Sequence, residues 1–417
     1  MARIIMLKIL TRYFLEGSYL NLSLNQELKN EKLSRQDKVL ITKVVYGVVQ
    51  YQLYLEYLLA PLIEGKKVKM RDKVILLMAL YQLEFLDSIP DYAVVSSSVN
   101  LAKAKSINAG KFVNAILNSY LAGKKPDVNN EDEDTRISIT TSHPLWIVKL
   151  FKAQYGLDTT KAILESNNQT PPRTARVNTL KTTREDICAS NPDFTMGLLA
   201  PDALYFKAGN IANTKEYQEG LVTIQDESSQ LVARVLDPKK TDLVLDMCAA
   251  PGSKTTHLAM LMENQGEIHA YDIYEHKLEL IREALNRLDI ANVKLFCQDA
   301  TTLKDTLERE SYDKILIDGP CSGLGVMRRK PEIRYNDSSV LDEVAKIQEK
   351  LLENGYYLLK KGGKMVYSTC TLNKKENEKM VASFIARHPD CQIEYQRTIL
   401  PFEYQSDGFY ICKITKE

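Results

Sequence analysis

The chain has 417 residues, of which 44% are hydrophobic and 26% charged, a composition typical of a globular protein with two or three domains. Lys and Arg number 55 and Asp and Glu 54, so the net charge of +1 indicates no particular partner. The longest apolar run, residues 74–80, is too short to span a bilayer, and basic residues interrupt the apolar N-terminus, which argues against a signal peptide. Seven cysteines without a CxxC pair predict neither a disulfide framework nor a metal site. We therefore expect a cytoplasmic protein that binds no metal and no membrane.

The charge is distributed unevenly along the chain. Residues 1–128 contain 18 Lys and Arg against 11 Asp and Glu, whereas the rest of the chain is net negative. A basic domain joined to an acidic one suggests that the first contacts a polyanion. A solvated basic surface without a partner would give the same count, so charge alone leaves both interpretations open.

Residues 1–128 are predicted to form an all-helical domain. Apolar residues recur at helical spacing within 40–49, 74–83 and 112–117, and Gly123 follows the last of these segments as a C-cap. The acidic run at 131–134 is predicted to be a linker, and a further helical stretch is predicted from about 144 to 167. Shorter segments then predict that residues 129–222 hold this linker and a small α+β subdomain.

Residues 223–417 show a regular alternation of short apolar runs and helices. Four runs end in or next to an acidic residue, namely Asp246, Asp272, Asp299 and Asp318, and a fifth run spans 365–367. Strands that alternate with helices predict a mostly parallel, doubly wound α/β sheet, whose ligands bind at the carboxyl ends of the strands. A cofactor is therefore expected near these acidic residues.

A loop of small residues follows the first predicted strand. It reads DMCAAPGSKTTH from Asp246, and a helix is predicted to begin at Lys254. Small side chains let backbone N–H groups approach a ligand, and a helix N-terminus favours a carboxylate or phosphate. The loop is neither a Walker A sequence nor GxGxxG. Asp272, at the end of the next strand, is the usual type of acceptor for a ribose diol, although a tight turn with a surface Asp would look the same.

Two cysteines follow later strands, in DGPCSGLG from Asp318 and in YSTCT from Tyr367. Parallel topology places both strand ends at one edge of the sheet, so Cys321 and Cys370 are predicted to face one ligand. A single cysteine is more often a small buried hydrophobe than a nucleophile. Two of them beside a predicted nucleoside pocket favour a chemical role.

Together these three motifs resemble the RNA cytosine-C5 methyltransferases that use S-adenosylmethionine. QDESS from Gln225, RRKPEI from Arg328 and ENE from Glu376 support the resemblance. The first 125 residues resemble the NusB-type helical RNA-binding domain, through VYGV from Val45 and FVNAIL from Phe112. This fusion is typical of the bacterial 16S ribosomal-RNA cytosine-C5 methyltransferase B group, the RsmB/Sun family.

The resemblance implies a fold for each part of the chain. Residues 223–417 are expected to form a Rossmann-like class I methyltransferase domain, preceded by an all-α NusB-like domain at 1–128 and a small RNA-binding subdomain within 129–222. Two positions depart from the family pattern, because Ser253 stands where a second Gly is usual and Asn118 where Arg is common. Neither change touches an expected catalytic group.

The resemblance also implies roles for individual residues. A thiolate must add at C6 of cytosine before C5 becomes nucleophilic enough to accept a methyl group, so the site is expected to lower a thiol pKa. Cys370 is expected to attack, Cys321 to assist loss of the C5 proton and release of the enzyme, and Asp318 to hydrogen-bond the N3/N4 edge of the base. The residues expected to hold S-adenosylmethionine are Cys248, Ala249, Ala250, Pro251, Gly252, Ser253, Lys254, Asp272, Asp299 and Asp318.

The expected partner is RNA. Arg328, Arg329 and Lys330 are expected to grip phosphates, with a solvated charge run as the alternative. The NusB-like domain favours 16S ribosomal RNA, modified before or during small-subunit assembly by a monomeric enzyme. The catalytic motifs would equally fit a tRNA cytosine-C5 methyltransferase. A non-catalytic RNA-binding assembly factor is a third hypothesis, against which both cysteines and all four acidic positions argue.

Overall fold

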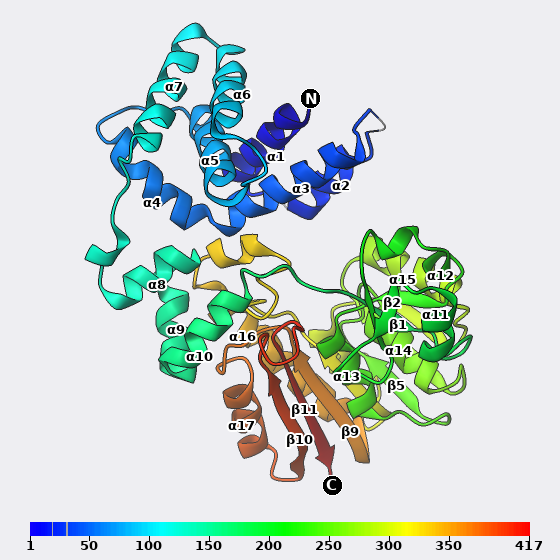
Figure 1. Ribbon diagram of the computed structural model, residues 1–417. Helices are drawn as coiled ribbons and strands as arrows, with labels where there is room; N and C mark the ends of the chain where they lie inside the picture. The colour runs from blue at the N-terminus through cyan, green and yellow to red at the C-terminus, as the bar shows by residue number, and fades with distance from the viewer. Residues whose placement is uncertain (19, 31) are drawn as a thin grey trace. The chain divides into compact units, whose positions relative to one another are not determined.

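The computed structural model describes residues 1–18, 20–30 and 32–417, which form two compact units. Unit 1 comprises 1–168 together with 330–336, and unit 2 comprises 169–329 and 337–417. The chain therefore leaves unit 2 once, between Arg329 and Asp337, to add a short segment to unit 1. Figure 1 shows both units in chain-order colours.

Unit 1 is helical, as the apolar spacing predicted. Its elements are α1 (Ala2–Glu16), α2 (Leu20–Leu28), α3 (Arg35–Gln50), α4 (Gln52–Ile63), α5 (Met70–Phe85), α6 (Asp91–Lys103), α7 (Ile107–Leu121), η1 (Val128–Asn130), α8 (Glu133–Thr141), α9 (Leu145–Tyr155), α10 (Leu157–Ser166) and η4 (Pro331–Tyr335). The interpretation of 131–134 as a linker is wrong for most of the run. The carboxylate of Asp132 caps α8 by accepting from the backbone N–H of Thr135, so the acidic residues begin a helix, where negative charge favours the helix dipole.

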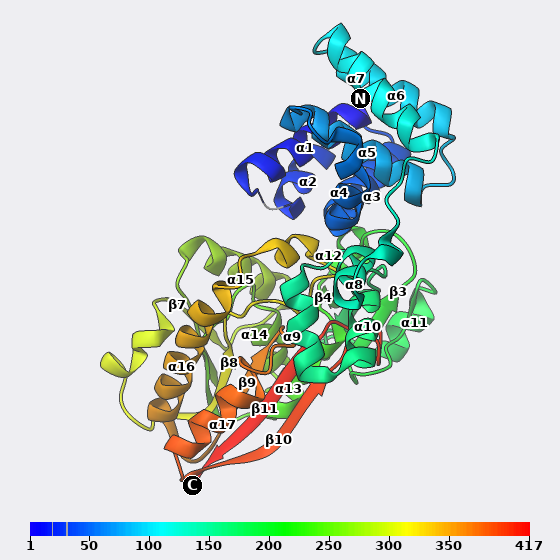
Figure 2. The ribbon, with the colours of Figure 1, turned by 90° about the vertical axis from the view of Figure 1, so that its left-hand side faces the viewer.

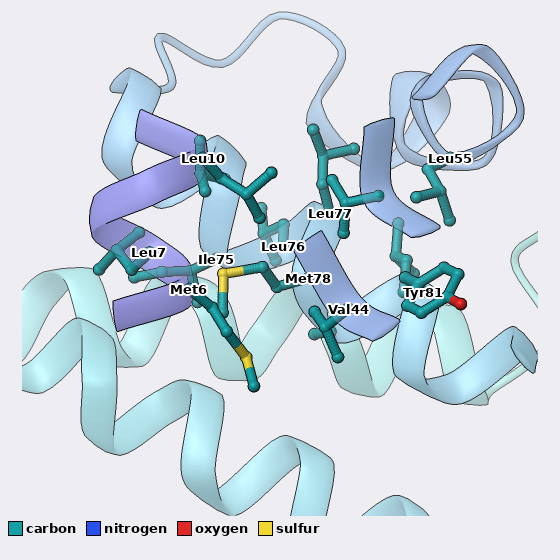
Figure 3. Packing of buried hydrophobic residues seen from close by; sticks show 14 of the residues in the cluster. Met6, Leu7, Leu10, Val44, Leu55, Ile75, Leu76, Leu77, Met78 and Tyr81 are labelled. Atoms are coloured by element: carbon teal, nitrogen blue, oxygen red, sulfur yellow. The ribbon is translucent and has the colours of Figure 1, made fainter. Parts of the chain in front are cut away.

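The core of residues 1–122 is built around α5. Every residue from Val74 to Gln82 is buried, so this helix is covered on all sides by its neighbours. Figure 3 shows Leu77 of α5 among side chains from other helices, including Leu10 of α1 and Leu55 of α4. Burial of each such side chain contributes about 1.5–3 kcal/mol, which explains why α5 carries a continuous apolar run.

The segment 330–336 is fixed to unit 1 by a buried arginine. Arg334 is fully buried, and its guanidinium group donates to the backbone carbonyls of Gln50 (3.0 Å), Ser142 (3.3 Å) and Asn167 (2.9 Å). The hydroxyl of Tyr335 donates to the carbonyl of Val49 at 2.9 Å. One guanidinium group thus donates hydrogen bonds to carbonyls from three places in the chain. This is possible because the planar group has five N–H donors.

Unit 2 begins with the small α+β part that the sequence predicted. Four antiparallel strands lie in the order β2 (Phe194–Met196), β3 (Ala203–Phe206), β1 (Arg173–Val177) and β4 (Val222–Ile224). Three short helical elements accompany them: α11 (Arg184–Ser190), η2 (Ile211–Asn213) and α12 (Lys215–Gln218). The rings of Phe194 and Phe206 contact each other in their core at a tilt of 40°, with centroids 4.8 Å apart.

A seven-stranded sheet forms the rest of unit 2. Its strands are β5 (Leu243–Asp246), β6 (Glu267–Asp272), β7 (Val293–Cys297), β8 (Tyr312–Asp318), β9 (Leu359–Thr369), β10 (Cys391–Ile399) and β11 (Phe409–Lys416). Their order is β10-β11-β9-β8-β5-β6-β7, in which β5 to β9 are parallel and β11 runs antiparallel to both of its neighbours, β9 and β10. The five predicted strands are confirmed, and the last two were not predicted. The order reverses between β5 and β8, the kind of switch point at which parallel sheets bind ligands.

Helices cover both faces of this sheet. The elements between the strands are α13 (Glu227–Leu236), α14 (Ser253–Leu261), α15 (Glu275–Leu288), η3 (Ala300–Asp305), α16 (Val340–Leu358) and α17 (Glu378–Arg387). Alternate residues of a strand point to opposite faces, so Val244 packs with α13, α14 and α15, whereas Leu245 packs with α16 and α17. Figure 2 shows α16 and α17 alongside the strands. This three-layer arrangement is the Rossmann-like α/β fold that the alternation predicted.

Candidate active site

The loop after β5 forms a tight cradle at the switch point. The backbone N–H of Ala249 donates to the carbonyl of Tyr271 in the next strand (2.9 Å), and that of Gly252 donates back to Ala249 (2.7 Å). Gly252 has φ of +97°, a conformation that an L side chain rarely adopts, and a Cβ there would lie 3.1 Å from Ile281. The helix α14 then begins at Ser253, one residue before the predicted Lys254.

Acidic side chains stand at the ends of the neighbouring strands. Asp272 ends β6 and is 8% exposed, and its carboxylate accepts from the backbone N–H groups of Ala250 (3.3 Å) and Tyr274 (3.1 Å). Asp299 follows β7 and is exposed, and its carboxylate caps η3 through the N–H of Thr301 at 2.8 Å. A carboxylate fixed by two backbone donors beside a cradle of small residues fits the ribose end of a nucleoside cofactor.

Asp246 is a further acidic residue of this loop that was seen as a strand end but not predicted as a site residue. It is 1% exposed, and burial raises its pKa to about 7. Its Oδ2 accepts from the hydroxyl of Thr255 at 2.7 Å, whereas the buried Oδ1 has no hydrogen-bond partner among the described residues. A buried polar atom without a partner costs free energy, so Oδ1 is available to a donor on a ligand in the cradle.

The small subdomain fixes the helix that carries the cradle. Arg176 of β1 donates to the carbonyl of Ser253 (2.6 Å) and to the hydroxyl of Thr256 (3.0 Å), and burial lowers its pKa to about 9. His257 of α14 shares a 3.0 Å hydrogen bond with the carboxylate of Asp202. These two contacts join the four-stranded sheet to the first turns of α14.

A lysine and a carboxylate link the cradle to β8. The ammonium of Lys254 pairs with Oδ2 of Asp318 at 2.6 Å, and the hydroxyl of Ser368 donates to Oδ1 of the same carboxylate at 2.8 Å. Asp318 therefore lies between the cradle and the end of β9. Both of its oxygens are oriented by neighbours, which fixes the direction of their remaining lone pairs.

The two predicted cysteines meet at the same edge of the sheet. The Sγ atoms of Cys321 and Cys370 are 3.2 Å apart. The register of β8 and β9 places Asp318 opposite Ser368, and the N–H of Gly325 donates to the carbonyl of Cys370 at 2.9 Å. A Cβ on Gly325 would lie 2.0 Å from the carbonyl oxygen of Gly408, so only glycine permits this approach.

The surroundings of Cys321 raise the pKa of its thiol. The pKa of Cys321 lies well above the ordinary value, because the thiol of Cys370 hydrogen-bonds to it and because it is buried. Burial, followed by the charge of Asp246, also raises the pKa of Cys248 well above the ordinary value. Cys248 packs against the apolar core near α16, an environment that disfavours its thiolate.

The basic run after Cys321 is used inside the protein. Arg328 is 5% exposed and donates to Asp407 at 3.0 Å. Arg329 donates to the same carboxylate at 2.7 Å and to Asp226 at 2.7 Å. Both guanidinium groups hold the loop to acidic side chains, Asp407, which is buried, and Asp226, which is half-buried. The expectation that Arg328 grips phosphates is therefore corrected, because this arginine is buried, whereas a contact of the half-buried Arg329 with RNA stays a prediction. Lys330 is exposed, and its expected contact with RNA stays a prediction.

Two further properties concern the described part of the chain, residues 1–18, 20–30 and 32–417. It contains no group of three or more His, Cys, Asp or Glu side chains arranged to hold a metal ion. None of its helices is long and apolar enough to cross a membrane.

The switch-point cradle, the fixed Asp272 and a seven-stranded sheet in which only β11 runs antiparallel define a Rossmann-like methyltransferase. The sequence matches three families: 16S rRNA methyltransferase RsmB/F over residues 233–415, the NusB family over 1–122 and the ferredoxin-like domain of RsmF/B-like methyltransferases over 143–190.

Relatives that match along the whole chain identify the family more specifically. The chain is 38% identical to the probable ribosomal RNA small subunit methyltransferase B of Bacillus subtilis (strain 168), over 100% of this chain and 98% of the relative. It is 34% identical to the corresponding protein of Synechocystis sp. over 96% of both chains. The crystal structure of PH0851 is similar with a TM-score of 0.84 and 25% identity, over 100% of this chain and 98% of that one. The chain belongs to the ribosomal RNA small subunit methyltransferase B family.

Proposed function

We propose that this chain methylates C5 of a cytosine in 16S ribosomal RNA through a transient bond between Cys370 and C6 of the base. S-adenosylmethionine supplies the methyl group, as a sulfonium whose methyl carbon is electrophilic. The single observation that carries the proposal is the pair of thiols, 3.2 Å apart, at the ends of adjacent parallel strands beside the cradle. Family membership supports the same reaction class.

The proposed chemistry assigns a different task to each thiol. C5 of cytosine is a poor nucleophile until a thiolate adds at C6, and Cys370 performs that addition. After methylation, a base removes the proton from C5, and the bond between carbon and Cys370 breaks to release the product. Cys321 acts in this step as its thiolate: it takes the proton from C5 and becomes a thiol, a double bond forms between C5 and C6, and the electron pair of the bond between C6 and sulfur leaves with Cys370 as a thiolate.

The remaining residues bind and orient in this proposal. The loop 248–254 surrounds the methionine part of the cofactor, Asp272 accepts from the ribose hydroxyls, and Asp299 accepts from the adenine amine. Asp318, oriented by Lys254 and Ser368, accepts from the cytosine amino group. The cytosine must be unpaired or flipped to reach the thiols, which favours RNA modified before or during subunit assembly. One copy of the chain contains all of these groups.

The test separates the two thiols and the two candidate RNAs. Cys370→Ala is expected to transfer no methyl group and to form no complex with RNA in denaturing gels. Cys321→Ala is expected to attack normally and to accumulate a covalent complex, because elimination stalls. Cys248→Ala is the control and should show neither defect in adduct chemistry.

The RNA is identified with the same proteins and a labelled methyl donor. Transcripts of 16S ribosomal RNA are expected to be methylated and to give the covalent complex, with tRNA as the comparison. Methylation of tRNA alone would replace the proposed substrate and keep the chemistry. A complex from Cys370→Ala, with none from Cys321→Ala, would reverse the two thiol roles.

A further inference from the structure

A fully buried glutamate, Glu376, binds the loop that carries Cys321. Its Oε2 accepts from the backbone N–H of Ser322 (2.9 Å) and from the side-chain amide of Gln348 (3.1 Å). Its Oε1 accepts from the hydroxyl of Ser322 (2.6 Å) and from the side-chain amide of Asn373 (3.0 Å). All four partners donate, which suits a carboxylate, whose oxygens act only as acceptors.

The next residue, Asn377, binds the segment that carries Cys370. Its side-chain oxygen accepts from the hydroxyl of Thr369 at 2.6 Å, and its side-chain nitrogen donates to the carbonyl of Thr371 at 2.9 Å. Asn377 is also fully buried. One amide therefore holds the residues on both sides of Cys370, and so fixes the backbone from which that thiol projects.

Two further contacts connect the same segments. The hydroxyls of Ser322 and Thr371, the residues directly after the two cysteines, are 2.8 Å apart. Gln348 of α16 donates to the carbonyl of Pro320, directly before Cys321, at 2.9 Å, in addition to its bond with Glu376. Every side chain in this network is buried, where a polar group that loses its partner is costly.

We propose that Glu376 and Asn377 are positioning residues that set the spacing of the Cys321 and Cys370 thiols. Glu376 holds one thiol loop, Asn377 holds the other, and the peptide bond between them joins the two. This inference rests on the proposed function of the thiols, because the spacing matters only if both act on one base. Neither side chain touches the reacting atoms, so each acts through the cysteines.

The test measures how readily the two thiols form a disulfide, which depends on the distance between their Sγ atoms. The oxidant diamide converts two neighbouring thiols into a disulfide, and its N=N bond takes up the two protons and two electrons as a hydrazine. Disulfide formation requires close approach of the two Sγ atoms with a defined dihedral angle. In the full-length protein, peptide mass spectrometry of the Cys321–Cys370 linked product then gives a rate constant that needs neither RNA nor methyl donor.

Glu376→Gln keeps the size of the side chain but replaces one acceptor by a donor that faces other donors. We expect the disulfide rate constant to fall by about tenfold or more, because the two loops separate. With RNA, kcat is expected to fall by about 10- to 100-fold while KM for S-adenosylmethionine stays within about twofold. A purely stabilising residue would change neither the disulfide rate nor the ratio of kcat to KM below the unfolding temperature.

The matched control is Glu227→Gln. Glu227 is equally buried in unit 2 and accepts from the backbone N–H of Ala200 (3.1 Å) and the hydroxyl of Tyr205 (2.5 Å), far along the chain from either thiol loop. It is expected to lower stability without changing the disulfide rate. If Glu376→Gln does not fold, Ser322→Ala removes only the hydroxyl contacts and is expected to slow the disulfide severalfold.

The outcomes separate this inference from the proposed function. A wild-type disulfide rate in Glu376→Gln, or in Ser322→Ala if the first variant does not fold, would overturn the positioning role even if the wild-type protein methylates 16S ribosomal RNA. A slowed disulfide in a protein whose wild type methylates no RNA would overturn the proposed function and keep the spacing role of Glu376.

Discussion

His257 makes the free energy of unfolding of unit 2 depend on pH. Its imidazole is 2% exposed, and burial, followed by the charge of Arg176, lowers its pKa from 6.5 to about 3. At neutral pH the ring is therefore neutral, and its Nε2–H donates to Asp202. In the unfolded chain the same ring has its ordinary pKa. Below about pH 6.5 the imidazole binds a proton in the unfolded state but not in the folded state. The free energy of unfolding therefore falls as the pH decreases from about 6.5 towards 3.

The size of the effect follows from the two pKa values. Between about pH 7.5 and pH 5.0, an imidazole whose pKa is 6.5 unfolded and about 3 folded contributes a loss of about 2 kcal/mol. Other buried groups change the total: His143 adds a loss of the same sign, whereas Asp246, whose pKa burial raises to about 7, adds a gain, so the absolute change does not isolate His257. His257→Gln removes the titrating ring and keeps an amide N–H that reaches towards Asp202.

Hydrogen exchange at the amides of α14 measures the relevant opening free energy. We expect the wild-type protein to lose about 2 kcal/mol more than His257→Gln between these two pH values, after correction for intrinsic exchange rates. A chain with the Arg234→Lys change, which retains His257 and a cation beside Asp202, should behave like the wild type. Equal losses in the wild type and His257→Gln would refute the assignment of this pH dependence to the buried imidazole.

Three further changes test other parts of the structure. Gly325→Ala forces a Cβ to within 2.0 Å of a backbone carbonyl, so activity should fall by about 100-fold while calorimetry shows an unchanged affinity for S-adenosylmethionine; normal activity would contradict the close approach. Asp272→Ala should weaken binding of S-adenosylmethionine by about 10- to 100-fold without affecting RNA binding, as measured by titration calorimetry and filter binding. Arg334→Leu leaves three buried carbonyls without a donor and should lower the free energy of unfolding by about 3 kcal/mol. Urea unfolding measures this change through the fluorescence of Trp146, the single tryptophan, which lies in unit 1. An unchanged unfolding midpoint would show that Arg334 does not stabilise the protein.

The sequence predicted the parts of the fold that local pattern determines. Apolar residues at helical spacing identified α5, and short apolar runs ending in acids identified β5 to β8. The strand β10 was not predicted, because most of its residues are at least partly exposed and give no clear apolar run. The strand β11 is mostly buried and begins with the apolar residues 409–412, and this signal was missed. The acidic run at 131–134 was misinterpreted because a helix N-terminus and a linker attract the same residues.

Some residues of the candidate site could be predicted from local sequence patterns, and others could not. Cys321, Cys370, Asp272 and the cradle are marked by local motifs, and the structure brings them to one edge of the sheet. The partners of Arg328 and Arg329 could not be predicted, because nothing in a basic run indicates which acidic residue, here 78 or 79 positions away along the chain, will pair with it. Position in the tertiary structure, not composition, decides whether such a run meets solvent or a buried carboxylate.

The thiol pair shows how strand register turns two separate motifs into one site. Asp318 and Ser368 occupy the same rung of β8 and β9, so Cys370 lies two residues beyond that rung and Cys321 three. Neither count is meaningful until the rung is known, because sliding one strand by a single residue would point its side chains to the opposite face. The register is fixed by burial of alternate side chains such as Leu316 and Val366, which belong to the apolar cluster against which Cys370 packs. The apolar core of the sheet therefore determines the distance between the two sulfur atoms, and the polar network around Glu376 holds it.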